Sequence, residues 1–505
     1  MAKNKNDRRK KSLMIVYIIE AVYRFLWGDL FTLRLGTFSM GVPLLVLLLI
    51  PTGIYFTFRT NFVSVRLFPD MVRSLTEKKG NNNSLSPLQT LFVSTATRVG
   101  MGNLVGVVAA VSAGGAGAVF WMWLSAILGS ATAFIEATLA QIHKEEDSLY
   151  GGFHGGPAYY IHYYAEKVRK KKLKHSVIAV LFALSGLLCW CGISQVISNS
   201  VASAFENAFS IPPIITTVIL VILSAVIVLR KNATVKALDI IVPVMAAMYF
   251  IITIFIIMTH IWQLPGVFSR IFKEAFGLRA VAGGGFGAVL MNGVKRGLFS
   301  NEAGSGSAPC AAAAADEKEP VKMGLIQALG VFIDTIVICS CTAFILLLVP
   351  EELTRGLMGM ELLQTAMNYH LGSFGVIFVA VILALFSFST FLGILFYDKG
   401  YAVKRRSARF FPLTARQKDN PDCRWQLGCT HHQQHADSQS DNHQGKHGRA
   451  VYLANGQILL PASNRSRKSG RSTSEFICNG FHQRYGSRLC SSRSGYLPCG
   501  SRFHF

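Results

Sequence analysis

Thr97 and Asn103 flank two glycines, Gly100 and Gly102, in the middle of an apolar stretch at residues 94–106. Unwound backbone at membrane depth persists only where it lines a cavity or packs inside protein. The half-helix after such a break directs its partly positive N-terminus into the cavity, which suits a carboxylate. The carbonyl end of the preceding half suits a cation such as sodium. We therefore predict ligand contacts here, with a glycine notch for helix packing as the alternative.

A second apolar stretch, residues 293–309, is interrupted in the same way. Its centre carries Phe299, Ser300 and Asn301, followed by further glycines. Two broken spans in comparable positions of two halves are the best sequence-level pointer to the substrate site of a transporter. The two interruptions together therefore predict one shared binding site.

Two carboxylates lie within apolar stretches, at Glu302 and Asp334. Such groups are costly at membrane depth unless they are paired, and they mark ion paths or internal pairs. Lys295 and Arg296 lie one to two helical turns before Glu302 and could pair with it. For both carboxylates an ion-path role and a structural role stay open, and Glu136 is predicted to be structural.

The composition predicts an all-α polytopic membrane protein. The 505-residue chain is 51% hydrophobic and 15% charged, against about 25% charged residues in soluble proteins. Its net charge of +23 does not point to nucleic acid, because the basic residues of the apolar part cluster in short loops. The cysteines show neither zinc spacing nor a redox pair, and no nucleophile–base arrangement predicts an enzyme. No cleavable signal peptide is evident.

The hydropathy pattern divides the chain into three parts. Residues 1–37 form a basic segment in which residues 13–36 are predicted to be an interfacial helix. Residues 38–398 form the membrane domain, and residues 399–505 form a basic polar tail for which disorder is predicted. Nine membrane spans are predicted, at about residues 39–58, 88–112, 117–142, 176–198, 211–230, 237–262, 282–312, 323–349 and 373–397.

The loops after odd-numbered spans are rich in lysine and arginine, which places them on the cytoplasmic side. The basic run at residues 167–174 is interpreted as part of a solvated cytoplasmic loop. This orientation puts the N-terminus outside, in conflict with its own basic run, residues 8–11.

Adjacent hydroxyls lie inside the ninth predicted span, at Ser389 and Thr390. Serine and threonine in apolar helices often bond back to their own helix. The alternative is that both hydroxyls complete an oxygen cage for sodium beside the first break.

Several motifs resemble the alanine or glycine:cation symporter family, the sodium:alanine carriers. The resemblance extends from about residue 38 to about residue 398 and is carried by residues 53–60 (GIYFTFRT), 99–103 (VGMGN), 114–123 (GGAGAVFWMW), 155–161 (GGPAYYI) and 296–304 (RGLFSNEAG).

The resemblance implies symport of sodium with small neutral amino acids, alanine or glycine, across the cytoplasmic membrane by alternating access. It implies a monomer with a leucine-transporter-type inverted repeat, in which spans two and seven are broken and one extra span comes first. Sodium is then a co-transported ion, held by Val99, Ser389 and Thr390. The implied substrate-binding residues are Thr97, Gly100, Gly102, Asn103, Phe299, Ser300, Asn301, Thr390 and Ile394.

The chain departs from the family pattern in two ways. Many members have tryptophan where Ile394 stands, so the size of the substrate stays open. The family has eleven spans, and only nine are predicted here. The tail composition fits a frameshift near residues 397–410, and the alternative to a transporter is therefore a non-functional truncated member. Coupling to protons in place of sodium also stays open.

Overall fold

The structure is a computed structural model. It describes residues 28–35, 38–76, 85–146, 152–229, 234–277 and 285–401, together with two short strands near the C-terminus and six single residues before residue 28. The chain separates into two units, Met1–Asn442 and His443–Phe505. In the second unit, β5 (Tyr452–Ala454) pairs with β6 (Gln457–Leu459) in an antiparallel hairpin. The rest of the predicted disordered tail, residues 402–451, 455–456 and 460–505, lies outside the described residues.

The first unit begins with an antiparallel pair, β1 (Asp29–Leu35) and β2 (Phe38–Pro43). The interfacial helix predicted for residues 13–36 is therefore wrong at residues 29–35. Strand pairing satisfies the backbone groups of both segments, and Phe31 and Thr32 are residue types that favour strands. The first apolar helix, α2 (Leu44–Arg59), accordingly begins five residues later than predicted.

The first predicted break is confirmed. Helix α5 (Pro87–Arg98) starts with a capping box in which Ser86 and Gln89 bond to each other's backbone N–H. The chain then leaves the helix and resumes in a π-helical turn, η1 (Gly102–Gly106), which continues into α6 (Val107–Gly114). The two halves are bent by 50° relative to each other. Single π turns inside helices are frequent at functional sites.

The second predicted break is also confirmed. Helix α13 (Gly285–Asn301) and the short helix α14 (Ser307–Ala313) are separated by residues 302–306. Three of these residues have left-handed backbone, namely Glu302 (φ 52°), Gly304 (φ 85°) and Gly306 (φ 85°). This conformation is easy for glycine and strained for glutamate.

The remaining long helices overlap the predicted spans, although α9 continues eleven residues beyond the predicted residue 198. They are α7 (Gly117–Ile142), α9 (Val177–Phe209), α10 (Pro213–Leu229), α11 (Thr234–Thr259), a continuous helical rod made of α15 (Pro320–Val331), the π-helical η3 (Phe332–Ile338) and α16 (Cys339–Leu347), and α19 (Ser373–Tyr401). Among the described residues, five helices are long and apolar enough to cross a membrane, and the bent pair makes a sixth. The count of nine spans stays a prediction.

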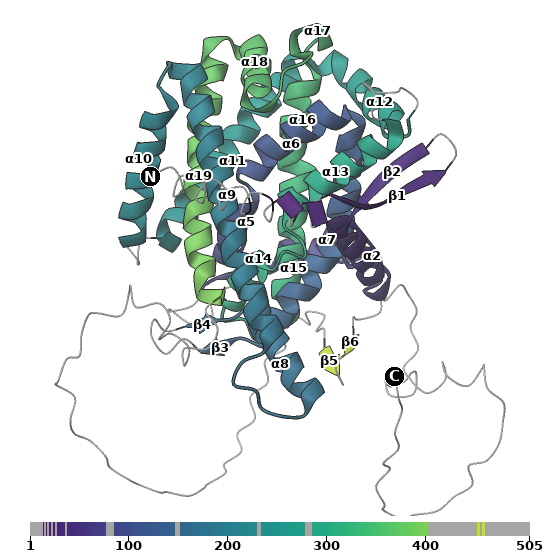
Figure 1. The fold of residues 1–505 in the computed structure, drawn as a ribbon, viewed down its shortest axis with the longest axis vertical. Coiled ribbons are helices and arrows are strands. Elements are labelled where there is room, and N and C mark those ends of the chain that lie inside the picture. The colour runs from purple at the N-terminus through teal and green to yellow at the C-terminus, as the bar shows by residue number, and fades with distance from the viewer. Residues whose placement is uncertain are drawn as a thin grey trace, which may run out of the picture. The chain divides into compact units, whose positions relative to one another are not determined.

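Shorter elements connect these helices. They are α3 (Val63–Arg66), α4 (Phe68–Ser74), β3 (Glu145–Glu146) paired with β4 (Phe153–His154), α8 (Pro157–Arg169), η2 (Ile261–Gln263), α12 (Leu264–Ala275), α17 (Glu351–Thr354) and α18 (Gly359–Leu371). Within the first unit, α8 lies at the opposite end of the helix bundle from α17 and α18 (Figure 1).

Helix α7 lies inside the first unit and packs against α13, α14, α15 and α2. Small residues on α7 and its neighbours let the backbones approach closely. A Cβ atom on Gly324 of α15 would come within 2.3 Å of the Thr138 hydroxyl, and one on Gly297 of α13 within 2.1 Å of the Ser125 hydroxyl. This packing holds the second break against a rigid helix.

Candidate functional site

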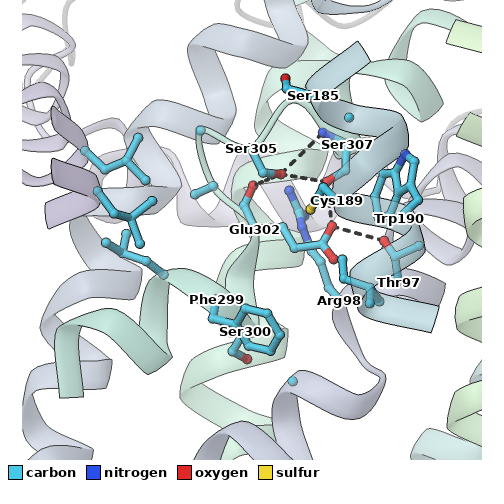
Figure 2. A pocket seen from close by; sticks show the side chains of 18 of the residues that line it. Thr97, Arg98, Ser185, Cys189, Trp190, Phe299, Ser300, Glu302, Ser305 and Ser307 are labelled. Atoms are coloured by element: carbon cyan, nitrogen blue, oxygen red, sulfur yellow. Dashed lines mark hydrogen bonds between the residues drawn. The ribbon is translucent and has the colours of Figure 1, made fainter. Parts of the chain in front are cut away.

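The two breaks open onto one cavity of about 440 Å³. Its walls come from both broken spans and from α2, α9 and α19, and Figure 2 shows the polar side chains that face it. The apolar part of the wall includes Leu45, Leu48 and Leu49 of α2 and Phe182 and Ile193 of α9. An apolar pocket with a few convergent polar groups is the usual form of a small-molecule site.

Six of the residues singled out from the sequence line this cavity, namely Thr97, Gly102, Phe299, Ser300, Glu302 and Thr390. The others lie next to it or in the packed interior, namely Val99, Gly100, Asn103, Asn301, Asp334, Ser389 and Ile394. The structure therefore brings both breaks and α19 together around one cavity, and the binding roles of these residues stay predictions.

Glycine is needed where the two breaks meet. A Cβ atom on Gly102 would lie 3.1 Å from the Cα atom of Ser300, and one on Gly100 would lie 2.4 Å from Oγ1 of Thr390. The second distance is far below ordinary contact, so any side chain at residue 100 displaces Thr390. The first break can therefore fit between the second break and α19 only because residues 100 and 102 have no side chains.

Asn103, Ser300 and Asp334 form a buried polar cluster behind the cavity. The Asn103 amide donates to Asp334 Oδ1 at 2.8 Å, and the Ser300 hydroxyl contacts Asp334 Oδ2 at 2.9 Å and Asn103 Oδ1 at 3.1 Å. Thr335 donates to the same carboxylate at 2.9 Å. These contacts tie η1, α13 and η3 together, so Asp334 has the internal partners that a carboxylate at this depth requires.

Glu302 connects the two broken spans directly. Its Oε2 atom accepts from Thr97 at 3.2 Å and from Ser307, the first residue of α14, at 2.5 Å. Figure 2 shows Glu302 grouped with Thr97, Ser305 and Ser307, whereas Phe299 and Ser300 lie apart from this group. Lys295, which the sequence offered as a partner, has its ammonium 3.8 Å from Asp29 Oδ1.

Arg98 was not singled out from the sequence, yet it is fully buried at the cavity wall. Its Nη1 donates to the side chain and the backbone carbonyl of Gln327, both at 3.2 Å. Its Nε and Nη2 have no hydrogen-bond acceptor in the described part of the chain. The guanidinium makes no ion pair within 4 Å in the described part of the chain, and its charge acts at longer range on three buried carboxyl groups, those of Glu136, Glu302 and Asp334. An arginine inside an apolar span is itself a functional signal, and it could have been recognised on that ground.

The hydroxyls of Ser389 and Thr390 converge on the end of α5. Both reach the carbonyl oxygen of Ala96, at 3.2 Å and 3.4 Å, and both also bond back to Phe386 within α19, at 2.9 Å and 2.8 Å. The back-bonding alternative is therefore confirmed, and the sodium cage stays a prediction. Val99, the predicted third sodium ligand, is buried and has non-helical backbone directly after α5.

Four predicted substrate contacts do not line the cavity, namely Gly100, Asn103, Asn301 and Ile394. Asn301 is fully buried, its Oδ1 accepts from the Ala303 N–H at 3.0 Å, and its Nδ2 has no partner among the described residues. Ile394 is half-buried and packs against the main hydrophobic core. Residues of α9, including Cys189 and Trp190, line the cavity instead. Nothing in the sequence indicated this role of α9, because α9 is an unbroken apolar helix.

No group of three or more His, Cys, Asp or Glu side chains among the described residues could hold a metal ion. The oxygen atoms around Ala96, Ser389 and Thr390 are of a different kind, hydroxyls and backbone carbonyls. Such weak oxygen ligands at a helix break suit an alkali cation that must bind and leave.

Comparison with known proteins identifies the family of the chain. A model of the sodium:alanine symporter family matches residues 31–404. The chain is 46% identical over 360 residues to the probable sodium/glutamine symporter GlnT of Bacillus subtilis. This alignment covers 70% of this chain and 73% of the relative. It is 43% identical over 354 residues to the amino-acid carrier protein AlsT of the same organism, covering 70% and 74%.

A third relative is the sodium/alanine symporter AgcS of Methanococcus maripaludis, 35% identical over 391 residues, with coverage of 76% of this chain and 82% of the relative. The matched region includes both breaks, the cavity and α19. The chain therefore belongs to the sodium:alanine symporter family.

Proposed function

We propose that the chain carries a small neutral amino acid together with sodium across the cytoplasmic membrane by alternating access. The observation that supports this most directly is the cavity into which both broken spans open, lined by Gly102, Ser300 and Thr390. Family membership supplies the coupled ion and the substrate class, since the relatives are named for sodium with alanine, glutamine or amino acids in general.

The substrate site of this proposal lies where the breaks approach each other. The backbone around Gly100 and Gly102, at the restart of the helix, receives the amino-acid carboxylate, because a helix N-terminus favours negative charge. Thr97, Ser300 and Phe299 line the same cavity. Asn103, in the buried cluster, and Asn301, in the interior, are proposed as further substrate-binding residues. Ile394 is proposed as another, on the packed face of α19.

The sodium site of the proposal lies between α5 and α19. The hydroxyls of Ser389 and Thr390 already point at the Ala96 carbonyl, and Val99 adds backbone oxygen at the unwound end of α5. When sodium occupies this place, its affinity for the loaded conformation must exceed its affinity for the other conformations, since only a difference in affinity can drive the cycle.

The architecture proposed for this function is the family's inverted repeat, preceded by α2, with five predicted spans in the first half and three in the second half before residue 399. In it, α5 with α6 and α13 with α14 are the equivalent broken spans. Glu302 and Asp334 are proposed as structural residues of the breaks, because both carboxylates have several internal hydrogen-bond donors.

Uptake into proteoliposomes tests the proposal. The purified full-length chain is reconstituted, and uptake of labelled alanine, glycine and glutamine is followed with and without an inward sodium gradient. We expect sodium-dependent accumulation of at least one of the three. Accumulation driven by a proton gradient alone would show that protons, and not sodium, are the coupled ion. The name of one relative, a putative sodium/proton-dependent alanine carrier, includes both ions.

The same assay tests the alternative of a non-functional truncated member, which no comparison supports. Binding of sodium and substrate without any accumulation would favour that alternative. Sequencing of the gene past codon 398 tests the frameshift hypothesis independently, because a shifted frame would contain hidden apolar spans.

A further inference from the structure

Helix α8 (Pro157–Arg169) and the turn after it carry a dense group of basic side chains at one end of the helix bundle (Figure 1). The exposed basic residues nearest the end of α8 are named the basic edge; they are Lys167, Arg169, Lys170, Lys171 and Lys172, and Lys174 beyond them is exposed as well. None of the five makes an ion pair within the described part of the chain. The sequence alone suggested a solvated loop, and the structure adds three observations to that interpretation.

The first observation is that the basic edge follows a defined helix end and that the neighbouring acidic side chain, Glu166, already has other partners. Glu166 accepts from the backbone N–H of Leu173 at 2.9 Å and lies 3.3 Å from Nε2 of His162. Lys170 ends α8 in a left-handed conformation, and the N–H of Lys171 bonds back to the carbonyl of Glu166 at 3.3 Å. Glu166 therefore forms no ion pair with any of the five basic side chains of the edge.

The second observation is that the exposed face of α8 is not purely charged. Tyr164, Val168 and Tyr163 are 67%, 60% and 50% exposed. Tyrosine next to lysine and arginine on an amphipathic helix is typical of helices that lie at the boundary between lipid and water.

The third observation is the level at which the edge must lie. Helix α9 begins at Val177, and its first apolar residues, Val177, Ile178 and Leu181, are 60–69% exposed. This helix is the longest apolar span of the described chain and presents most of its surface outward. Only four residues separate Lys172 from Val177, so the basic edge lies where the bilayer begins.

From these observations we propose that the basic edge and the adjoining tyrosines of α8 bind the headgroups of anionic phospholipids. The phosphodiester groups supply the missing negative charge, and Tyr164 and Val168 enter the apolar boundary below them. Each basic residue near an anionic membrane surface raises the affinity for that surface by about fivefold. The consequence for the protein is that the link between α7 and α9 is anchored to the membrane surface.

Native mass spectrometry of the purified full-length chain tests this inference and does not depend on transport. The chain in mild detergent is offered phosphatidylglycerol and phosphatidylcholine at equal concentration. We expect at least a fivefold excess of retained phosphatidylglycerol for the parent chain, and less than a twofold excess for K170Q/K171Q/K172Q. High salt should reduce the excess for the parent chain as well, because screening shortens the reach of exposed charge.

A charge-matched control removes three exposed basic residues elsewhere, as K273Q/K318Q/R355Q. It should retain phosphatidylglycerol like the parent chain. Equal retention by all three proteins, or equal loss in both triple variants, would overturn the proposal, the latter because net charge alone would then explain it. Size-exclusion profiles of all three proteins establish that each is folded.

Discussion

The two breaks interrupt their spans by different means. In the first break the backbone N–H groups find backbone partners close by, with Val99 bonded to Thr95 at 2.6 Å and Gly100 to Arg98 at 2.8 Å. In the second break they find side chains, with Ala303 bonded to Asn301 at 3.0 Å and Gly304 to Glu136 at 3.2 Å.

The difference shows what each break can tolerate. The first break depends on the absence of side chains, because Gly100 and Gly102 are pressed against Thr390 and Ser300. The second break depends on the presence of polar side chains, because buried backbone groups without partners are costly. Substitutions that add side-chain atoms should therefore damage the first break. Substitutions that remove polar side-chain groups should damage the second.

Arg98 links the two breaks, and its removal should have the largest effect. The substitution Arg98→Met leaves Glu136, Glu302 and Asp334 without their shared cation in the interior. It also removes two hydrogen bonds from a charged donor to Gln327, and bonds of this kind contribute about 1.5–3 kcal/mol each. We expect a clearly lower melting temperature in a thermal-shift assay of the detergent-solubilised protein, with loss of uptake.

The double variant R98M/E302Q provides the control for this prediction. Because it also removes one of the uncompensated carboxylates, it should recover part of the lost stability. If R98M melts like the parent chain, the guanidinium is not the counter-charge of these carboxylates, and the electrostatic link between the breaks is wrong.

A methyl group at the first break should have the next largest effect. Gly100→Ala places a Cβ atom 2.4 Å from Oγ1 of Thr390 and 3.1 Å from the carbonyl oxygen of Thr97. Overpacking of this kind costs about 1–3 kcal/mol, or up to roughly a hundredfold in sodium-dependent uptake. The matched control is Gly192→Ala in α9, where an added Cβ meets nothing within 4 Å and uptake should be unchanged. Equal behaviour of the two variants would remove the packing argument for the first break.

The hydroxyl that Gly100 accommodates should control the response to sodium. Thr390→Val keeps the shape of the side chain and removes an oxygen that points at Ala96. Contacts to a charged group contribute about 1.5–3 kcal/mol, so the half-saturating sodium concentration in uptake should rise at least about tenfold. Ser387→Ala is the control, since Ser387 bonds to Leu383 of its own helix at 2.7 Å. A similar rise in both variants would place sodium elsewhere.

The sequence predicted the parts of this comparison that depend on residue type. Glycines inside apolar stretches located both breaks, and paired hydroxyls located the face of α19 that meets α5. The sequence did not predict Arg98 as the shared cation, because the three carboxylates around it come from distant segments. The wall formed by α9 was also missed, since its Cys189 and Trp190 look like ordinary residues of an apolar span.

Two errors had local causes. Residues 29–35 mix apolar and charged side chains, which fits an interfacial helix as well as a strand, and only the pairing with residues 38–43 decides between them. Helix α8 was not predicted separately from the basic cytoplasmic loop. Its exposed face carries tyrosines and lysines, and only a short part of it is buried.

The smallest predicted effect concerns Ser305 within the second break. Its hydroxyl donates to the carbonyl of Glu302 at 2.7 Å and lies 2.9 Å from the hydroxyl of Ser307. Ser305 itself is exposed to the cavity, so water can replace the lost hydroxyl, and Ser305→Ala should cost only about 0.5–1 kcal/mol. Uptake by this variant should fall by two- to fivefold. Uptake by Ser307→Ala should fall further, because that substitution removes a donor to Glu302. If Ser305→Ala were the more damaging of the two, the second break would be held by its exposed loop and not by its buried carboxylate.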